Sequence, residues 1–356
     1  MSGRRARTGR VRQSDIARLA GVSQTTVSLV LNGAPESAAI PEATRERVLA
    51  AARELSYVAD PAALSLAKGN NRLIGVHTFM ATFPVGASNT YYPYLAGVEE
   101  ETARQGYDLL LFTGSAAEPN DGPVELPRLR MADGALLVGR RFALMGVEAL
   151  LDSGFPLVYV GRHDELGERL PYIGADYVGA TAELVRRLHG LGHRRFVYVR
   201  EHDDAIASAD RERGYREGAA AAGLAPDDAT VVRTDGSDIT AGTVARWLAD
   251  GRTALIVEGG TDALAAALAV QRAAADAGLA FPRDLSLALA GERVGHECGA
   301  PVLTGFTVPR LEMGRQAVRL LVDLITGTPV PSGARQRLLA CSPLDGETAG
   351  PPPGHT

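Results

Sequence analysis

The chain has 356 residues, of which 46% are apolar and 22% are charged, and its formal net charge is −5. This composition is ordinary for a soluble globular protein, and the length fits two or three domains of about 100–200 residues each. The only two cysteines, Cys298 and Cys341, exclude a disulfide framework and a cysteine-based zinc site. Because no run approaches the roughly 18 apolar residues of a membrane span and no apolar segment follows the basic N-terminus, we expect a cytoplasmic protein.

The charge is unevenly distributed along the chain. Residues 1–72 carry 11 Lys and Arg against 6 Asp and Glu, a net charge of +5, which leaves −10 for the remainder. A small basic head on a large acidic body is the asymmetry expected when a module that binds a polyanion is attached to something else. A chance fluctuation of surface charge is the alternative, and charge alone does not exclude it.

The basic head begins with arginines and continues with helical patterns. Residues 1–12 contain five arginines among Gly, Ser and Thr, and we expect a disordered basic arm there. Residues 13–59 carry three short helical patterns and no strand signal. Residues 60–72 are helical at first and end in Gly69-Asn70-Asn71, which indicates a short helix followed by a linker.

The first two helical patterns have the spacing of a helix-turn-helix. Ile16, Leu19 and Ala20 share one helix face, and Gly21 can adopt the positive φ that ends a helix. Ser23 is suited to cap the next helix, whose outer face carries small polar side chains that fit a major groove. An ordinary three-helix packing unit is the alternative, which this spacing and the basic arm disfavour.

From residue 73 the pattern changes to short apolar runs that alternate with amphipathic helical stretches. This alternation is typical of βαβ units that build buried parallel sheets. Residues 73–341 are too many for one such sheet, so the sequence predicts an α/β body of two subdomains. The tail, 342–356, is rich in Pro and Gly and is expected to be disordered. The predicted strands are 73–76, 108–112, 134–138, 157–160, 196–199, 254–257 and 285–289.

The head closely resembles that of the LacI/GalR family of transcription regulators in DIARLAGVSQTTVS, residues 15–28, and in Asn32-Gly33. The resemblance continues through Thr44–Val48 and Leu55–Tyr57 and covers about residues 12–341. It implies an all-α helix-turn-helix head, a hinge helix within 60–72, and a body like the periplasmic sugar-binding proteins. Such a body consists of two doubly wound parallel-sheet subdomains with a ligand cleft between them.

The resemblance also implies which residues contact operator DNA. In the family a hinge leucine wedges into the minor groove and kinks the operator, and Leu66 stands at that place. Leu29 and Leu64 stand where many members have arginine, so we expect an operator that departs from the family's usual consensus. The implied DNA-binding residues are Ser23, Gln24, Thr25, Thr26, Ser28, Leu29, Asn32, Tyr57 and Leu66.

A small, sugar-like effector is implied between the two body subdomains. Arg211 and Asp262 occupy positions that usually hydrogen-bond effector hydroxyls, and both groups offer several fixed hydrogen-bonding directions. Tyrosines could supply ring faces, although a tyrosine after a strand is usually part of the core, and Arg162 could instead pair with a neighbouring acid. The candidate effector-binding residues are Tyr91, Tyr92, Arg162, Asp176, Arg211 and Asp262.

The sequence lacks the motifs that would indicate an enzyme. His189 and His193 are four residues apart, as in a metalloprotease zinc motif. The segment between them contains two glycines, which disfavour a helix, and no Glu, so the motif is not present. We interpret the two histidines as structural or surface residues, and Trp247 as part of helix packing. The P-loop, dinucleotide-binding and GxSxG patterns are absent, so we expect no catalytic residue, metal or cofactor.

The sequence therefore predicts a homodimeric transcriptional regulator, most simply a repressor of sugar-utilisation genes, that reads a pseudo-palindromic double-stranded operator and binds no membrane. Effector in the cleft would change the hinge helix and thereby the operator affinity. A solute-binding protein or sugar sensor without direct operator control is one alternative, which the helix-turn-helix disfavours. An NAD-type α/β enzyme with an accessory head is another, and it lacks a cofactor fingerprint.

Overall fold

The computed structural model divides into two compact units, a head up to Asn71 and a body from Arg72 onward. Most of the predicted basic arm and of the predicted hinge lies outside the described residues, and so do Leu66 and Asp262. The described residues are 11–32, 35–58, 71–79, 90–113, 126–139, 144–202, 205–258, 264–292 and 301–354.

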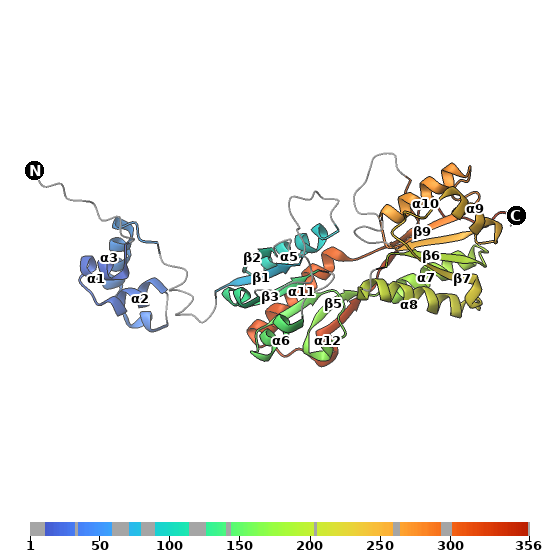
Figure 1. Ribbon diagram of the computed structural model, residues 1–356. Coiled ribbons are helices and arrows are strands. Elements are labelled where there is room, and N and C mark those ends of the chain that lie inside the picture. The colour runs from blue at the N-terminus through green and yellow to red at the C-terminus, as the bar shows by residue number, and fades with distance from the viewer. Residues whose placement is uncertain are drawn as a thin grey trace, which may run out of the picture. The chain divides into compact units, whose positions relative to one another are not determined.

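The head contains the three predicted helices (Figure 1). Gly21 ends the first helix with a φ of 66°, as its place after an apolar face predicts. The Thr26 backbone N–H donates to Ser23 Oγ at 3.1 Å, which is the predicted cap of the second helix. The helices are α1 (Gln13–Ala20), α2 (Gln24–Asn32) and α3 (Glu42–Glu54), with a short 3-10 helix at Pro35–Ala39.

The three helices of the head meet in a small apolar core. Ile16 of α1, Val27 of α2 and Val48 of α3 have no exposed surface, and the cluster continues into Leu55 and Tyr57 after α3. Each large apolar side chain buried in this way stabilises the fold by about 1.5–3 kcal/mol. The core fixes α2 against α1 and α3 and leaves the outer face of α2 at the surface.

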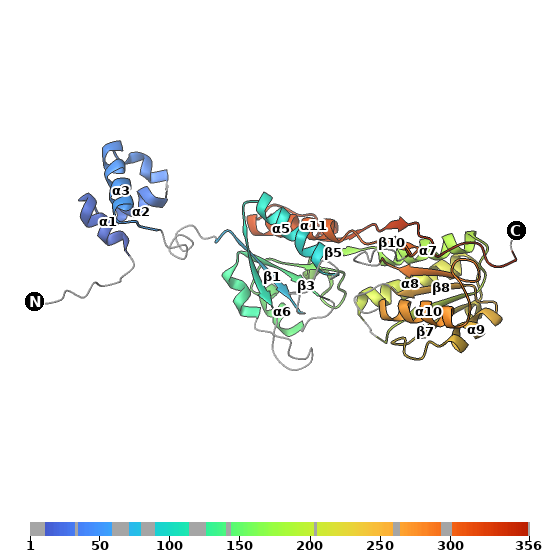
Figure 2. The same ribbon diagram turned by 90° about the horizontal axis from the view of Figure 1, so that it is seen from above.

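The first lobe of the body is a six-stranded parallel sheet in the order β11-β5-β4-β3-β1-β2 (Figure 2). Four of its strands were predicted, whereas β5 and β11 were not. The strands are β1 (Leu73–Thr78), β2 (Asp108–Thr113), β3 (Gly134–Val138), β4 (Leu157–Val160), β5 (Tyr172–Ala175) and β11 (Gln336–Leu339).

Helices cover both faces of the first sheet, with α5 (Tyr92–Arg104) and α11 (Arg310–Thr326) on one face and α6 (Leu144–Asp152) on the other (Figure 2). The backbones of α5 and α11 approach each other closely. A Cβ at Gly97 would lie 2.0 Å from the Leu311 carbonyl oxygen, so glycine is required at this crossing.

The second lobe is a four-stranded parallel sheet in the order β7-β6-β8-β9, with helices on both faces (Figure 1). Side chains alternate between its faces: Phe196 and Tyr198 pack toward α7 and α8, while Val197 and Val199 pack toward α9 and α10. The elements are β6 (Phe196–Arg200), β7 (Ala229–Arg233), β8 (Ala254–Glu258), β9 (Ser286–Ala290), α7 (Tyr177–Gly190), α8 (Ile206–Ala221), α9 (Ala241–Ala249) and α10 (Leu264–Asp276).

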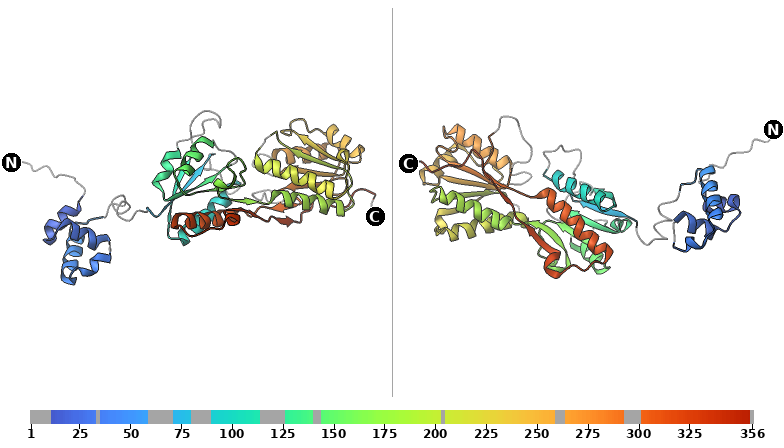
Figure 3. Two further views of the ribbon diagram at one scale, coloured as in Figure 1. Left: turned by 90° about the horizontal axis from the view of Figure 1, so that it is seen from below. Right: turned by 180° about the vertical axis from the view of Figure 1, so that it is seen from behind.

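The chain passes between the two lobes three times (Figure 3). The first passage leads from β5 to α7, the second from β10 (Gly305–Thr307) to α11, and the third from β11, which follows α12 (Ser332–Arg335), to β12 (Ser342–Leu344). The Asp176 backbone N–H of the first passage donates to the Leu339 carbonyl of the third at 2.9 Å, which ties the two connections together.

The prediction that 342–356 is disordered is wrong for the described part, up to residue 354. β12 pairs antiparallel with β10, and Thr348 is buried, with its Oγ1 donating to the Leu287 carbonyl at 2.7 Å and accepting from the Thr304 N–H at 3.0 Å. Pro and Gly disfavour helices, but an extended chain that contains them can still satisfy hydrogen bonds along a neighbouring strand. The tail therefore belongs to the second lobe.

Candidate functional site

The outer face of α2 carries most of the predicted DNA-binding residues. Gln24 and Thr25 are exposed, while Ser28 and Leu29 are half-buried. Asn32 Nδ2 donates to Ser28 Oγ at 3.1 Å, so these two polar side chains already satisfy one another in part. Gln24 and Thr25 are therefore the most exposed of the predicted DNA-binding side chains on α2.

The remaining predicted DNA-binding residues have other environments. Ser23 and Thr26 form the cap of α2, with their hydroxyl oxygens 2.9 Å apart. Tyr57 packs against the apolar core of the head. Leu66 lies outside the described residues.

A pocket in the body is lined by residues of both lobes, at the carboxyl ends of β3, β4 and β8. Open parallel sheets commonly bind ligands beyond the carboxyl ends of their strands. Tyrosine rings and charged groups of both signs line this pocket. Its aromatic and charged lining residues are Tyr91, Tyr94, Tyr159, Arg162, Tyr177, Asp210, Arg211, Glu258 and Arg310.

Arg211, a predicted effector-binding residue, is buried and firmly held at the pocket. Its Nε donates to the Ala290 carbonyl at 2.8 Å and its Nη1 donates to the Ala207 carbonyl at 3.0 Å. Its guanidinium lies over the Tyr177 ring, 3.7 Å from the ring centroid, which is a cation–π contact. The guanidinium is thus pre-oriented before any ligand arrives.

Arg162 lines the pocket and also pairs with a neighbouring acid, the alternative considered from the sequence. Its Nε and Nη2 donate to the two carboxylate oxygens of Asp210 at 2.6 and 2.7 Å, in a bidentate ion pair. It also contacts Asp164. Burial by itself would lower the pKa of Arg162, but the hydrogen bonds and charges of these two carboxylates raise it, so the residue stays cationic.

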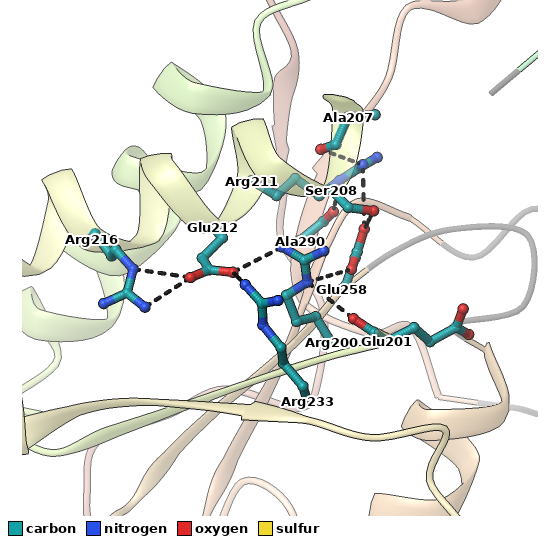
Figure 4. Close-up of polar contacts among 10 residues, drawn as sticks. All are labelled: Arg200, Glu201, Ala207, Ser208, Arg211, Glu212, Arg216, Arg233, Glu258 and Ala290. Atoms are coloured by element: carbon teal, nitrogen blue, oxygen red, sulfur yellow. Dashed lines mark hydrogen bonds and ion pairs between the residues drawn. The ribbon is translucent and has the colours of Figure 1, made fainter. Parts of the chain in front are cut away.

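Glu258 at the end of β8 connects the pocket to a buried ion-pair network (Figure 4). Its carboxylate accepts a hydrogen bond from Ser208 and lies 3.8 Å from Arg211 Nη1 and 3.9 Å from Arg200 Nε. Arg200 Nη1 in turn donates to Glu212 at 2.8 Å. Positive and negative side chains therefore follow one another from the pocket into the second lobe.

The network ends at two arginines nearer the surface (Figure 4). Glu212 accepts hydrogen bonds from Arg216 at 2.8 and 3.0 Å and from Arg233 at 3.0 Å. Burial alone would raise the pKa of the Glu212 carboxyl, but hydrogen bonds from Arg216 and Arg200 hold it below its ordinary value. Glu212 is therefore ionised at neutral pH and compensates the buried charge of Arg200.

The structure separates the predicted effector-binding residues. Arg162, Arg211 and Tyr91 line the pocket, whereas half-exposed Tyr92 does not line it. The Asp176 carboxylate caps α7 by accepting from the Gly179 N–H at 2.8 Å.

Several residues that line the pocket were not predicted from the sequence, among them Tyr94, Tyr177, Asp210, Glu258 and Arg310. For Glu258 a signal was present, because it ends the apolar run 254–257 and the carboxyl ends of such strands are where ligands bind. Asp210 carried no such signal, since its importance comes from an ion pair with a residue 48 positions away.

His193, one of the two histidines interpreted as structural or surface residues, is held inside the second lobe. His193 is buried, and its ring nitrogens hydrogen-bond Thr253 Oγ1 at 2.7 Å and Ser286 Oγ at 2.9 Å, which is a structural role. Among the described residues, no group of three or more His, Cys, Asp or Glu side chains is placed to hold a metal ion. No helix in the described ranges is both long enough and apolar enough to cross a membrane.

The comparisons with known proteins cover nearly the whole chain. The model of bacterial regulatory proteins of the lacI family matches residues 14–60, and that of the periplasmic binding protein-like domain matches residues 185–348. The chain is 31% identical over 317 residues to the HTH-type transcriptional regulator CelR of Thermobifida fusca, across 88% of this chain and 91% of that protein. It is 27% identical over 329 residues to the HTH-type transcriptional repressor CytR of Escherichia coli (strain K12), across 90% and 92%.

Solved structures agree with these relatives in fold. A CelR–cellobiose complex matches with a TM-score of 0.63 and 26% identity, over 95% of this chain and 100% of that one. The lac repressor dimer bound to operator and the anti-inducer ONPF matches with a TM-score of 0.70 and 22% identity, over 96% and 100%. Together with the head, the two-lobed body and the similarity to CelR, these matches show that the chain is a DNA-binding transcriptional regulator that belongs to the lacI family.

Proposed function

We propose that the protein is a homodimeric repressor whose operator affinity is controlled by a sugar-like effector bound in the pocket between the lobes. The observation that carries this proposal is the pocket itself. Both lobes contribute to it, and it combines tyrosine rings with fixed guanidinium and carboxylate groups, the chemistry that suits a ligand with many hydroxyls. The protein acts as a binding protein rather than an enzyme, in the cytoplasm where operator DNA lies.

Both kinds of partner have support in the relatives. The CelR structure is a complex with cellobiose, and the lac repressor structure is a dimer bound to operator DNA. We carry a saccharide effector, a pseudo-palindromic operator and a homodimer over to this chain on that basis. A sugar sensor without operator control is disfavoured, because the head has the capped α2 with its exposed polar face.

The proposed control links the pocket to the hinge. A ligand that touches both lobes binds best to one relative arrangement of them, so it shifts the equilibrium between arrangements. Residues 60–72 join the first lobe to the head, and a change in that lobe alters how the hinge presents the two heads of the dimer. The coupling required is typically about 1–3 kcal/mol.

The experiment is an operator-binding titration on DNA from upstream of the protein's own gene, with and without cellobiose, maltose, glucose and galactose. We expect binding that weakens steeply with salt, because the basic head displaces counterions from phosphates. A flat salt response contradicts the assignment of the head to phosphates.

Two variants test the pocket in the same titration. Arg211→Ala and Asp262→Ala should each bind operator normally yet respond to effector about 5- to 150-fold less sensitively, since we propose that each side chain hydrogen-bonds the effector and the loss of such a partner costs about 1–3 kcal/mol. Arg169→Ala, in the exposed ion pair with Asp152, is the control and should respond like the parent protein. A normal response from both variants places the effector elsewhere.

A further inference from the structure

Each arginine that lines the pocket already has a carboxylate partner. Arg162 has the bidentate pair with Asp210, Arg211 lies 3.8 Å from Glu258, and Arg310 contacts Glu292. In this contact the Nη1 of Arg310 donates to the Glu292 carboxylate. Arg310 is about as deeply buried as Arg211. The three cations that face the ligand space are therefore compensated before any ligand binds.

The charged residues behind the pocket lining, which surround Glu212, do not add an excess of positive charge near the pocket. Arg200, which also approaches Glu258, is buried and has its own partner in Glu212. Arg216 and Arg233, the other partners of Glu212, are 61% and 45% exposed, so solvent and salt screen their charges. An anionic ligand would thus lose its hydration and meet no uncompensated cation in return.

The same pocket offers hydrogen-bond donors and acceptors to the hydroxyl groups of a ligand. The Nε of Arg310 is buried and has no hydrogen-bond partner in the described part of the chain, which leaves a donor to satisfy. Carboxylates such as Glu258 retain lone pairs that accept from ligand hydroxyls, and tyrosine rings can cover the apolar face of a sugar ring. A neutral polyol can donate and accept here without adding charge.

We propose that the pocket selects an uncharged saccharide and rejects its phosphorylated and carboxylated derivatives, with Glu258 as the residue that sets this selectivity. This inference rests on the sugar-like effector proposed above and narrows its chemical class. Glu258 acts by neutralising Arg211 and by repelling an anion at the carboxyl end of β8. Asp210 of α8, in the second lobe, likewise neutralises Arg162 of the first lobe, so their ion pair joins the two lobes beside the pocket.

The test is isothermal titration of the full-length protein with glucose, galactose, maltose and cellobiose, each beside its 6-phosphate, and with glucuronate. We expect at least one neutral sugar to bind, and its phosphate to bind at least ten-fold more weakly. Glu258→Gln keeps the shape and removes the charge, so the ratio between the two affinities should shrink by about ten-fold. Glu168→Gln, an exposed site of the same charge, should leave the ratio unchanged.

Each outcome separates this inference from the function on which it rests. A phosphorylated or carboxylated sugar that binds as tightly as its neutral counterpart overturns the charge selectivity while the sugar effector stands. An unchanged ratio in a Glu258→Gln protein that retains the parent melting temperature overturns the role of Glu258. If no sugar of either class binds while operator binding persists, the sugar effector itself fails, and the selectivity fails with it.

Discussion

Removing the Glu212 side chain should destabilise the second lobe strongly, because the buried Arg200 guanidinium loses the carboxylate that it contacts at 2.8 Å. Glu212 accepts from three arginines, and Arg200 is only 2% exposed in its side chain. In Glu212→Ala, the Arg200 guanidinium loses the 2.8 Å ion pair and keeps its other contacts, among them the Glu201 carbonyl at 3.1 Å and the Glu258 carboxylate at 3.9 Å.

The magnitude follows from the burial of each partner. Removing one partner of a buried ion pair typically costs about 3–5 kcal/mol, because the buried charge that remains has lost its nearest opposite charge. The pairs with Arg216 and Arg233 are largely exposed on the arginine side and add less than about 1 kcal/mol each. For a body of this size the main term corresponds to a fall in Tm of roughly 6–20 °C.

Urea unfolding followed by tryptophan fluorescence is the assay. Trp247 is the only tryptophan in the chain and is buried in the core of the second lobe, so its emission reports on the lobe that contains Glu212. Glu217→Ala is the matched control on the same helix: Glu217 is 59% exposed and 3.9 Å from Arg213, so it should cost less than about 1 kcal/mol. Glu212→Gln should fall between the two, since it keeps the shape and loses the charge.

A Glu212→Ala protein within about 1 kcal/mol of the parent, or no less stable than Glu217→Ala, would refute the reasoning. It would mean that Arg200 reaches water or another anion once its partner is gone. The effector response provides a second readout, because Arg200 also lies beside Glu258 at the pocket.

Four further predictions concern the head, the hinge, the tail and pH. Ser23→Ala should lower the stability of the head by about 1 kcal/mol, measured by thermal unfolding of the head, because α2 loses its cap; an unchanged transition would contradict this. Leu66→Ser should reduce operator affinity and bending, measured by energy transfer, with an unchanged Tm, and unaltered bending would remove the proposed wedge. Ending the chain at Cys341 removes β12 and buried hydrogen bonds of the tail, so the urea midpoint of the tryptophan transition should fall by an amount equivalent to about 2–3 kcal/mol; equal midpoints would refute the tail's role. Burial lowers the pKa of His77 and of His163 below the ordinary 6.5, so the unfolded chain takes up protons first and stability should fall as the pH drops below about 6.5; a double His→Gln variant should flatten that dependence, and an equally steep curve would assign it to other groups.

The sequence alone determined the head and most of the sheet strands. Helix faces, the left-handed Gly21 and the Ser23 cap depend on residues three or four positions apart, so they can be read locally. The central strands are buried on both faces and appear as continuous apolar runs. Three strands of the two large sheets were missed. β7 and β11 are half-buried edge strands, and β5, although buried, has only four residues, with Gly174 among them, so none of the three shows a long apolar run.

Tertiary structure decided which polar residues form the pocket and how their charges are compensated. Arg162 meets Asp210 across 48 residues, and the Ser286 hydroxyl meets the Gly350 carbonyl across 64. Such partners are brought together by crossovers between strands and between lobes, so no local spacing in the sequence announces them. The third connection between the lobes brings the Pro- and Gly-rich tail beside β10, where it pairs as a strand. The arrangement of the two lobes likewise makes Glu258, the last residue of an apolar run, a charged lining residue of the pocket.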